Sequence, residues 1–257
     1  MEMTEYEHGV PSWVDVSVPD LPAARAFYAA LFGWDVPEGP PEAGGYSIAT
    51  LRGRSVAGVG PQMNPAAPPA WTTYVNVDSA DEAAAAVASA GGRMLVPPMD
   101  VLDVGRMGIL ADPAGAVLGL WQPRAHRGAQ VVNEPGTYCW SELVTTDLPG
   151  AAAFYGAVFG WGTNEAGDGM TYVEWQVFGR SVGGMMPKPA EMPAGIPPHW
   201  GVYFAVEDAD RAASRIGELG GTVVVGPMDI EPGRFAVAVD PIGASFNVLA
   251  LKAGLGG

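Results

Sequence analysis

Two kinds of apolar spacing follow one another near the start of the chain. Apolar side chains first alternate with others, which places the two sets on opposite faces of a predicted strand. The apolar positions of this strand are Val14, Val16 and Val18. A spacing of three and four residues follows, as on the buried side of a helix. Its positions are Ala24, Phe27, Tyr28 and Leu31. Asp20 is placed to cap this helix and Gly33 to end it. The pattern predicts a strand and a helix, with Trp13 and Asp15 on the strand face turned away from the helix.

The whole stretch occurs twice in the chain. Residues 13–34 recur as residues 140–161, at a constant offset of 127 residues. Weaker versions at 71–92 and 200–221 again indicate a strand followed by a capped helix that ends at glycines. Short alternating stretches after each helix predict further strands, and an Asp-Pro-x-Gly turn precedes the last strand of each half. We therefore expect a duplication within a duplication, in which each half contains two βαβββ modules.

Stretches without periodicity mark the boundaries of this organisation. Residues 123–137 carry proline, glycine and charge, which is typical of a linker. The predicted first domain is 1–122, and the predicted second domain is 138–257. Residues 1–10 are expected to form a loose polar lead-in.

Composition and charge narrow the class of protein. Of 257 residues, 48% are hydrophobic and 16% are charged, so a sizeable core is expected. There is no apolar run of about 18 residues and no secretory signal pattern, which favours a cytoplasmic protein without a membrane partner. The net charge of −15 disfavours nucleic acid as a partner. The single Cys139 permits no intramolecular disulfide, and we interpret it as a buried structural thiol.

Taken together, the modules and motifs resemble the vicinal oxygen chelate superfamily. This superfamily includes glyoxalase I, extradiol dioxygenases, fosfomycin-resistance enzymes and bleomycin-resistance proteins. The resemblance rests on a DLxxAxxFYxxxFGW signature after the first strand of each half and on the DPxG turns, and it covers nearly all of residues 12–250. It implies an α+β fold of two tandem domains, each with a mixed, mostly antiparallel sheet that curls into a cup. The chain looks similar to a tandem, actinobacterial-type glyoxalase-like subgroup, some members of which accompany antibiotic biosynthesis.

Metal-dependent members of the resembled superfamily place His or Glu ligands on four strands inside the cup. The matching positions of this chain hold Trp13, Thr72 and Gly119 in the first half and Trp140, Gly201 and Asn247 in the second. The hairpin strands predicted at 55–60 and 181–186 contain no His, Asp, Glu or Cys. The histidines of the chain are His8, His126 and His199. Because zinc, iron and nickel need several imidazole, carboxylate or thiolate donors at one point, we predict no metal and no other cofactor.

Two carboxylates are the candidates for catalysis. Asp15 and Glu142 occupy matching positions, two residues after Trp13 and Trp140. A carboxylate that faces an apolar cup has a raised pKa, which suits a general base or a ligand-orienting acceptor. The alternative is a structural ion pair with Arg54, Arg106, Arg180 or Arg234. The residues expected to bind the ligand are Trp13, Tyr46, Trp71, Tyr74, Arg106, Trp140, Tyr172, Trp175, Met185, His199, Tyr203 and Asn247. The second cup, with Asn247 where the first has Gly119, is expected to be the more specific site.

Three functions stay open. The first is metal-independent binding of a hydrophobic or aromatic small molecule, with or without turnover, in antibiotic or polyketide tailoring or in resistance. The second is a metal-dependent lyase or dioxygenase with unusual ligands such as Asp15, Glu142 or His199. The third is an interaction protein with collapsed cups. A monomer or a homodimer is expected in each case.

Overall fold

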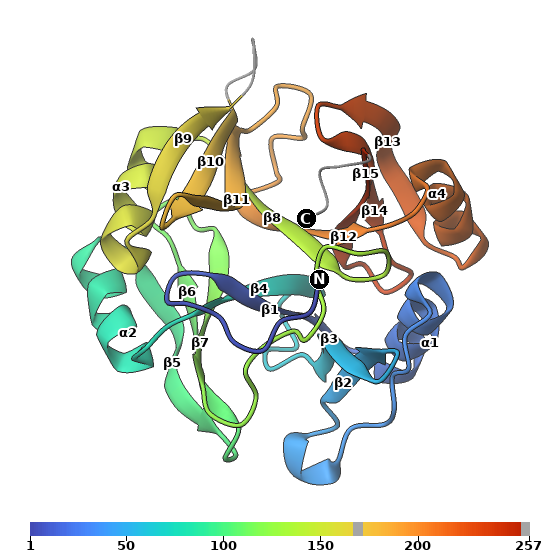
Figure 1. The fold of residues 1–257 in the computed structure, drawn as a ribbon, viewed down its shortest axis with the longest axis horizontal. Coiled ribbons are helices and arrows are strands. Elements are labelled where there is room, and N and C mark those ends of the chain that lie inside the picture. The colour runs from blue at the N-terminus through green and yellow to red at the C-terminus, as the bar shows by residue number, and fades with distance from the viewer. Residues whose placement is uncertain (167–171, 253–257) are drawn as a thin grey trace.

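The computed structural model describes residues 1–166 and 172–252 and confirms the predicted α+β fold. Within these residues the strands form two mixed sheets, one of seven and one of eight strands, flanked by four α-helices (Figure 1). No helix in this part of the chain is both long and apolar enough to cross a membrane.

The seven-stranded sheet uses strands from residues 11–123. Its elements are β1 (Pro11–Val18), α1 (Leu21–Phe32), a short 3₁₀ helix (Pro41–Ala43), β2 (Ser47–Leu51), β3 (Arg54–Pro61), β4 (Ala70–Asn76), α2 (Ala80–Ser89), β5 (Arg93–Val101), β6 (Gly105–Ala111) and β7 (Val117–Pro123). The strand order is β2-β3-β1-β4-β7-β6-β5. The first module, β1-α1-β2-β3, has one strand fewer than the predicted βαβββ, and it meets the second module, β4-α2-β5-β6-β7, where β1 pairs antiparallel with β4.

The eight-stranded sheet repeats this plan with one added strand. Its elements are β8 (Tyr138–Thr145), α3 (Leu148–Phe159), β9 (Gly162–Ala166), β10 (Tyr172–Val177), β11 (Arg180–Pro187), β12 (His199–Ala205), α4 (Ala209–Glu218), β13 (Thr222–Ile230), β14 (Gly233–Val239) and β15 (Ser245–Leu251). The order is β13-β14-β15-β12-β8-β11-β10-β9. The sequence pattern did not predict β9, which pairs antiparallel with β10 at the sheet edge.

The predicted helix signals act as expected. The Asp20 side chain accepts a hydrogen bond from the Ala23 backbone N–H at 3.0 Å, and Asp147 does the same for Gly150 at 2.9 Å. Gly33 ends α1 with a φ of 73°, a left-handed conformation that glycine adopts without steric cost. These local choices fix where each helix starts and stops, and thereby how its aromatic face meets the sheets.

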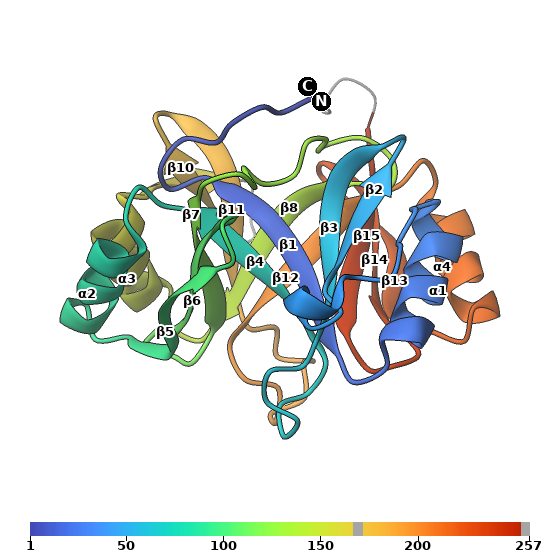
Figure 2. The ribbon, with the colours of Figure 1, turned by 90° about the horizontal axis from the view of Figure 1, so that it is seen from below.

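The helices pair across the two halves. Helix α1 lies beside α4, and α2 lies beside α3, with the strands between the two pairs (Figures 1 and 2). One hydrophobic core joins α1 to Phe204 and Phe246 of the second half. The other joins α3 to residues of the first half such as Leu110. Each half therefore completes the core of the other, which the sequence pattern did not predict.

Residues of the repeated signature make reciprocal hydrogen bonds between the halves. The hydroxyl of Tyr28 donates to the Asp240 carboxylate at 2.7 Å, and that of Tyr155 donates to Asp112 at 3.0 Å. Both aspartates belong to the DPxG turn of the opposite half. The indoles of the two FGW motifs bind the connecting segments: Trp34 donates to the Gly136 carbonyl of the linker and Trp161 to the Gly9 carbonyl of the lead-in, each at 2.6 Å. The signature thus holds the halves together.

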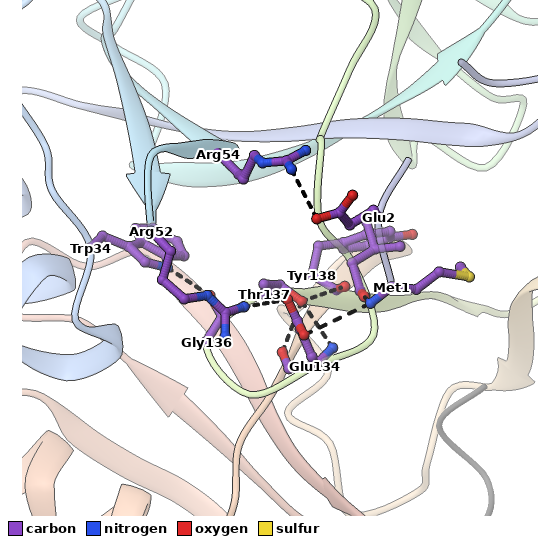
Figure 3. Close-up of polar contacts among 10 residues, drawn as sticks. Met1, Glu2, Trp34, Arg52, Arg54, Glu134, Gly136, Thr137 and Tyr138 are labelled. Atoms are coloured by element: carbon purple, nitrogen blue, oxygen red, sulfur yellow. Dashed lines mark hydrogen bonds and ion pairs between the residues drawn. The ribbon is translucent and has the colours of Figure 1, made fainter. Parts of the chain in front are cut away.

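The lead-in was expected to be loose, and the structure corrects this. The N-terminal amino group donates to the Val132 carbonyl at 2.8 Å, and the Arg54 guanidinium pairs with Glu2 at 2.9 Å. Around the same point Arg52 pairs with Glu134, as Figure 3 shows. Because both the lead-in and the linker supply backbone groups to these contacts, the two segments lie against each other and against the first sheet.

Candidate functional site

The face of each sheet turned away from the helices carries one carboxylate at the same place; we call this face the cup. In the first cup Asp15 lies between Gly58 on β3 and Thr72 on β4. In the second cup Glu142 lies between Gly184 on β11 and Gly201 on β12. The glycines make room for aromatic rings. A Cβ on Gly58 would lie 1.9 Å from the Tyr46 hydroxyl, and one on Gly184 would lie 2.0 Å from that of Tyr172.

In the first cup, tyrosine hydroxyls hold the carboxylate. Tyr46 donates to Asp15 Oδ2 at 3.0 Å and accepts from the Trp13 indole at 2.9 Å. Burial raises the pKa of Asp15 to about 7, although hydrogen bonds from Tyr46 and Tyr74 offset part of this effect. Asp15 is only 6% exposed, and its Oδ1 has no hydrogen-bond partner among the described residues. A buried carboxylate oxygen without a hydrogen-bond donor destabilises the ionised form, so Asp15 holds a proton more readily than an ordinary aspartate.

The second cup repeats the arrangement with a longer carboxylate. Tyr203 donates to Glu142 Oε1 at 2.8 Å, and the Trp140 indole donates to the Tyr172 hydroxyl at 2.8 Å. Burial raises the pKa of Glu142, and the hydroxyls of Tyr203 and Tyr172 lower it in part. The carboxyl group can therefore give or accept a proton closer to neutral pH than a solvated glutamate can.

An amide lies beside this carboxylate. Asn247 on β15 is the register partner of Tyr203, and its Nδ2 donates to the Val202 carbonyl at 3.1 Å. The next cup-facing position along β14 and β13 is occupied by Phe235 and Met228, which pair with each other. The floor of the second cup is thus polar at Glu142 and Asn247, with apolar side chains beside it.

The two cups differ in how open they are. Trp13 is 4% exposed and Asp15 6%, whereas Trp140 and Glu142 are half-buried. The difference arises from the linker, because the ring of His126 packs edge-on against the Trp13 ring with centroids 4.4 Å apart. The first cup is filled from within by its own chain.

The predicted site residues separate into two groups. Those on the cup faces are Trp13, Asp15, Tyr46, Tyr74, Trp140, Glu142, Tyr172, Tyr203 and Asn247. Three others were wrongly assigned to the cups, because they lie in the cores on the helix-facing side: Trp71, Trp175 and Met185. Trp71 donates to the Tyr28 hydroxyl at 2.8 Å, and the Trp175 ring packs against the ring of Tyr155.

One further predicted ligand-binding residue lies outside the cups. Arg106 forms ion pairs with Asp81 and Asp100 on the helix side of the first sheet. His199 pairs in register with Val144, which lies two residues from Glu142 on the same strand face, so His199 lies at the end of the second cup face. Its Nδ1 is 2.9 Å from the Pro197 carbonyl oxygen.

The arginines offered as structural partners of the carboxylates are engaged elsewhere. Arg54 pairs with Glu2, Arg106 with Asp81 and Asp100, Arg180 with Glu7, and Arg234 with Asp210 and Asp229. Asp15 and Glu142 instead accept hydrogen bonds from tyrosine hydroxyls, which stabilise an ionised carboxylate less than a guanidinium does. Sequence reasoning missed His126 as a cup residue, since nothing in the irregular linker indicates where it folds back.

The side chains of these cups do not supply the donors that a metal site of the resembled superfamily needs. Across residues 1–166 and 172–252, no three His, Cys, Asp or Glu side chains gather where they could hold an ion. The strand positions that would supply ligands carry indoles, a glycine and an amide instead: Trp13, Trp140, Gly119 and Asn247.

One open hollow lies outside both cups. It has a volume of about 430 Å³ and is lined by Thr145, Thr146, Asp147, Leu148, Pro149, Pro187 and Lys188, at the start of α3. It contains neither candidate carboxylate, and its Lys188 ammonium group is already bound to the Ala194 and Ile196 carbonyls.

Comparison with known proteins decides the family. The sequence matches the Glyoxalase/Bleomycin resistance protein/Dioxygenase superfamily over residues 11–120 and again over 140–248. The chain belongs to this superfamily. A Mycobacterium bovis protein with the provisional name glyoxylase CFP32 is 46% identical over 96% of both chains. The anthracycline biosynthesis protein DnrV of Streptomyces peucetius is 38% identical over 98% of this chain and 97% of its own.

Solved structures of the superfamily share the fold. The Mn(II)-bound glyoxalase from Novosphingobium aromaticivorans superposes with a TM-score of 0.66 at 18% identity, covering 96% of this chain and 84% of that one. The 2,3-dioxygenase LapB from Pseudomonas sp. KL28 gives 0.64 at 15% identity, covering 95% and 93%. At such identities the likeness concerns the fold alone, since one scaffold of this kind hosts unrelated chemistries.

Proposed function

We propose that this chain is a glyoxalase-fold tailoring protein that binds a flat aromatic small molecule in its second cup without a metal. The observation that carries the proposal is the half-buried Glu142, held by Tyr203 and close to Tyr172, in a cup whose described residues include no metal-ligand set. Apolar and aromatic walls with a few convergent polar groups are the usual form of small-molecule sites.

The chemistry available at this site is hydrogen bonding and proton transfer. With its raised pKa, Glu142 can donate a hydrogen bond to a ligand carbonyl when protonated and accept a proton when ionised. Asn247 donates one of its two Nδ2 protons to the Val202 carbonyl, and its Oδ1 can accept a hydrogen bond from a ligand hydroxyl. A polycyclic aromatic compound that carries adjacent carbonyl and hydroxyl groups matches this pair. The likeness to DnrV, whose name places it in anthracycline biosynthesis, supports the same ligand class.

A binding titration tests the proposal. Tryptophan fluorescence of the wild type should be quenched saturably by dihydroxyanthraquinone, a flat hydroxy-carbonyl compound. Glu142→Ala should weaken binding roughly tenfold, as expected for the loss of one hydrogen bond of about 1.4 kcal/mol. Its melting temperature should stay near that of the wild type, because Glu142 lies on a half-open wall. The matched control is Glu218→Ala, which removes an exposed carboxylate on α4.

Three outcomes contradict the proposal. The wild type could fail to bind the compound, or Glu142→Ala could bind it as the wild type does. Weakening by Asp15→Ala in place of Glu142→Ala would move the site to the first cup.

A further inference from the structure

The first cup already contains an aromatic ring. The imidazole of His126 lies against Trp13 with ring centroids 4.4 Å apart and ring planes at 84°. Its ring centroid also lies 5.5 Å from that of Trp121, whose indole donates to the His126 carbonyl at 2.9 Å. Edge-to-face contacts of this kind are favourable because the positive edge of one ring meets the negative face of the other.

The linker that carries this ring is fixed at both rims of the cup. On one side the backbone N–H of His126 donates to the Val104 carbonyl at 3.0 Å, in the turn before β6. On the other side Ala129 donates to Ser12 at 2.8 Å, and Gln130 donates to Ser55 at 2.7 Å. These contacts join the linker to both modules of the first sheet, so that it spans the cup between them.

The ring is held there in its neutral form. Burial lowers the pKa of His126 to about 4, and its Nε2 is buried without a hydrogen-bond partner among the described residues. The cup thus accommodates an uncharged, flat heterocycle beside its tryptophan.

The second cup has the same tryptophan, and no ring of the described residues lies against it as His126 lies against Trp13. Trp140 matches Trp13, and Leu249 takes the place of Trp121. Trp140 is correspondingly half-buried where Trp13 is buried.

We propose that His126 is a built-in occupant of the first cup, and that the second cup takes one uncharged aromatic ring of an external ligand at the matching place, edge-on to Trp140. This deepens the proposed function and rests on it, since it uses the same cup. It adds the position and charge of the ring, and a stoichiometry of one ligand per chain.

Calorimetry with benzimidazole, a small uncharged aromatic heterocycle at neutral pH, tests the stoichiometry. The wild type should bind one molecule per chain. His126→Ala should bind two, because the vacated place beside Trp13 becomes a second site. His8→Ala, which changes a histidine of the lead-in that lies beside Asp78, should still bind one. A folded His126→Ala variant that binds one molecule overturns the proposal, as does a wild type that binds none or two.

A second measurement needs only the wild type and covers the case in which His126→Ala fails to fold. In a proton–nitrogen NMR titration, benzimidazole should shift the indole N–H signal of Trp140 and leave that of Trp13 unchanged. The two signals are assigned with Trp140→Phe and Trp13→Phe. A shift of Trp13 alone, or of neither, overturns the proposal. If dihydroxyanthraquinone does not bind while benzimidazole shifts Trp140, the proposed function fails and the ring site stands.

Discussion

The free energy of unfolding of Asp15→Asn, relative to that of the wild type, should increase as the pH rises. Folding raises the pKa of Asp15 from 3.8 to about 7, mainly because burial disfavours the charged form. Between these two values the folded protein keeps a proton that the unfolded chain has released. The free energy of unfolding of the wild type therefore falls as the pH rises through this window. One pKa unit corresponds to about 1.36 kcal/mol, so the total loss is about 4 kcal/mol, of which about 3 kcal/mol falls between pH 5 and pH 8.

His126 gives the opposite slope in part of the same window. Its pKa falls from 6.5 to about 4 on folding, so the unfolded chain binds the extra proton and stability is lost as the pH falls through this range. The pH profile of the wild type alone therefore understates the contribution of Asp15. The difference between Asp15→Asn and the wild type isolates it, because His126 is present in both.

Urea unfolding at pH 5 and pH 8 measures this difference. The free energy of unfolding of Asp15→Asn minus that of the wild type should be larger at pH 8 by up to about 3 kcal/mol. Asp103→Asn, in the exposed turn between β5 and β6, serves as the control and should show no such change. A difference for Asp15→Asn that stays the same at both pH values would show that Asp15 is ionised throughout, and would refute the reasoning.

Two further predictions concern the contacts between the halves and the metal. Tyr28→Phe should lower the free energy of unfolding by roughly 1–3 kcal/mol, since it leaves the buried Trp71 indole and one oxygen of Asp240 without a partner; an unchanged urea midpoint would show that the Tyr28–Asp240 contact contributes nothing. Elemental analysis of protein purified without chelators should give far less than one transition metal per chain, because indoles occupy the first-strand ligand positions. Zinc, nickel or iron held near one per chain would overturn the metal-free assignment.

The sequence predicted the elements well where a pattern has one explanation. The switch from alternation to a helical spacing after Asp20 located β1 and α1, and the 127-residue offset located β8 and α3. The added strand β9 has no alternating apolar pattern, so only its pairing with β10 reveals it. The shared cores were also out of reach, because an amphipathic helix shows which face is buried without showing which sheet buries it.

The sequence pattern placed Asp15 and Glu142 on the cup faces, as the strand register does, but it misplaced two tryptophans for an identifiable reason. Alternation divides a strand into two faces, but both faces of β4 and β10 carry aromatic residues. Only the register resolves the choice: Trp71 pairs with Val16, whose side chain faces the helices, whereas Tyr74 pairs with Trp13 in the cup. His126 comes from a linker without any period, and its place depends on hydrogen bonds made by backbone groups far from it in sequence.

The residues of the signature that identifies the superfamily are therefore separate from the cup residues that we propose contact a ligand. In the FYxxxFGW signature, Tyr28 and Tyr155 bind the opposite halves, whereas Trp34 binds the linker and Trp161 the lead-in. Selection for a stable pair of halves can preserve these residues whatever the cups contain. The cup side chains alternate with core side chains on the same strands, so they can change without disturbing the core. This separation explains how a chain can match the superfamily over both halves while carrying indoles, a glycine and an amide at strand positions where its metal-dependent members carry ligands.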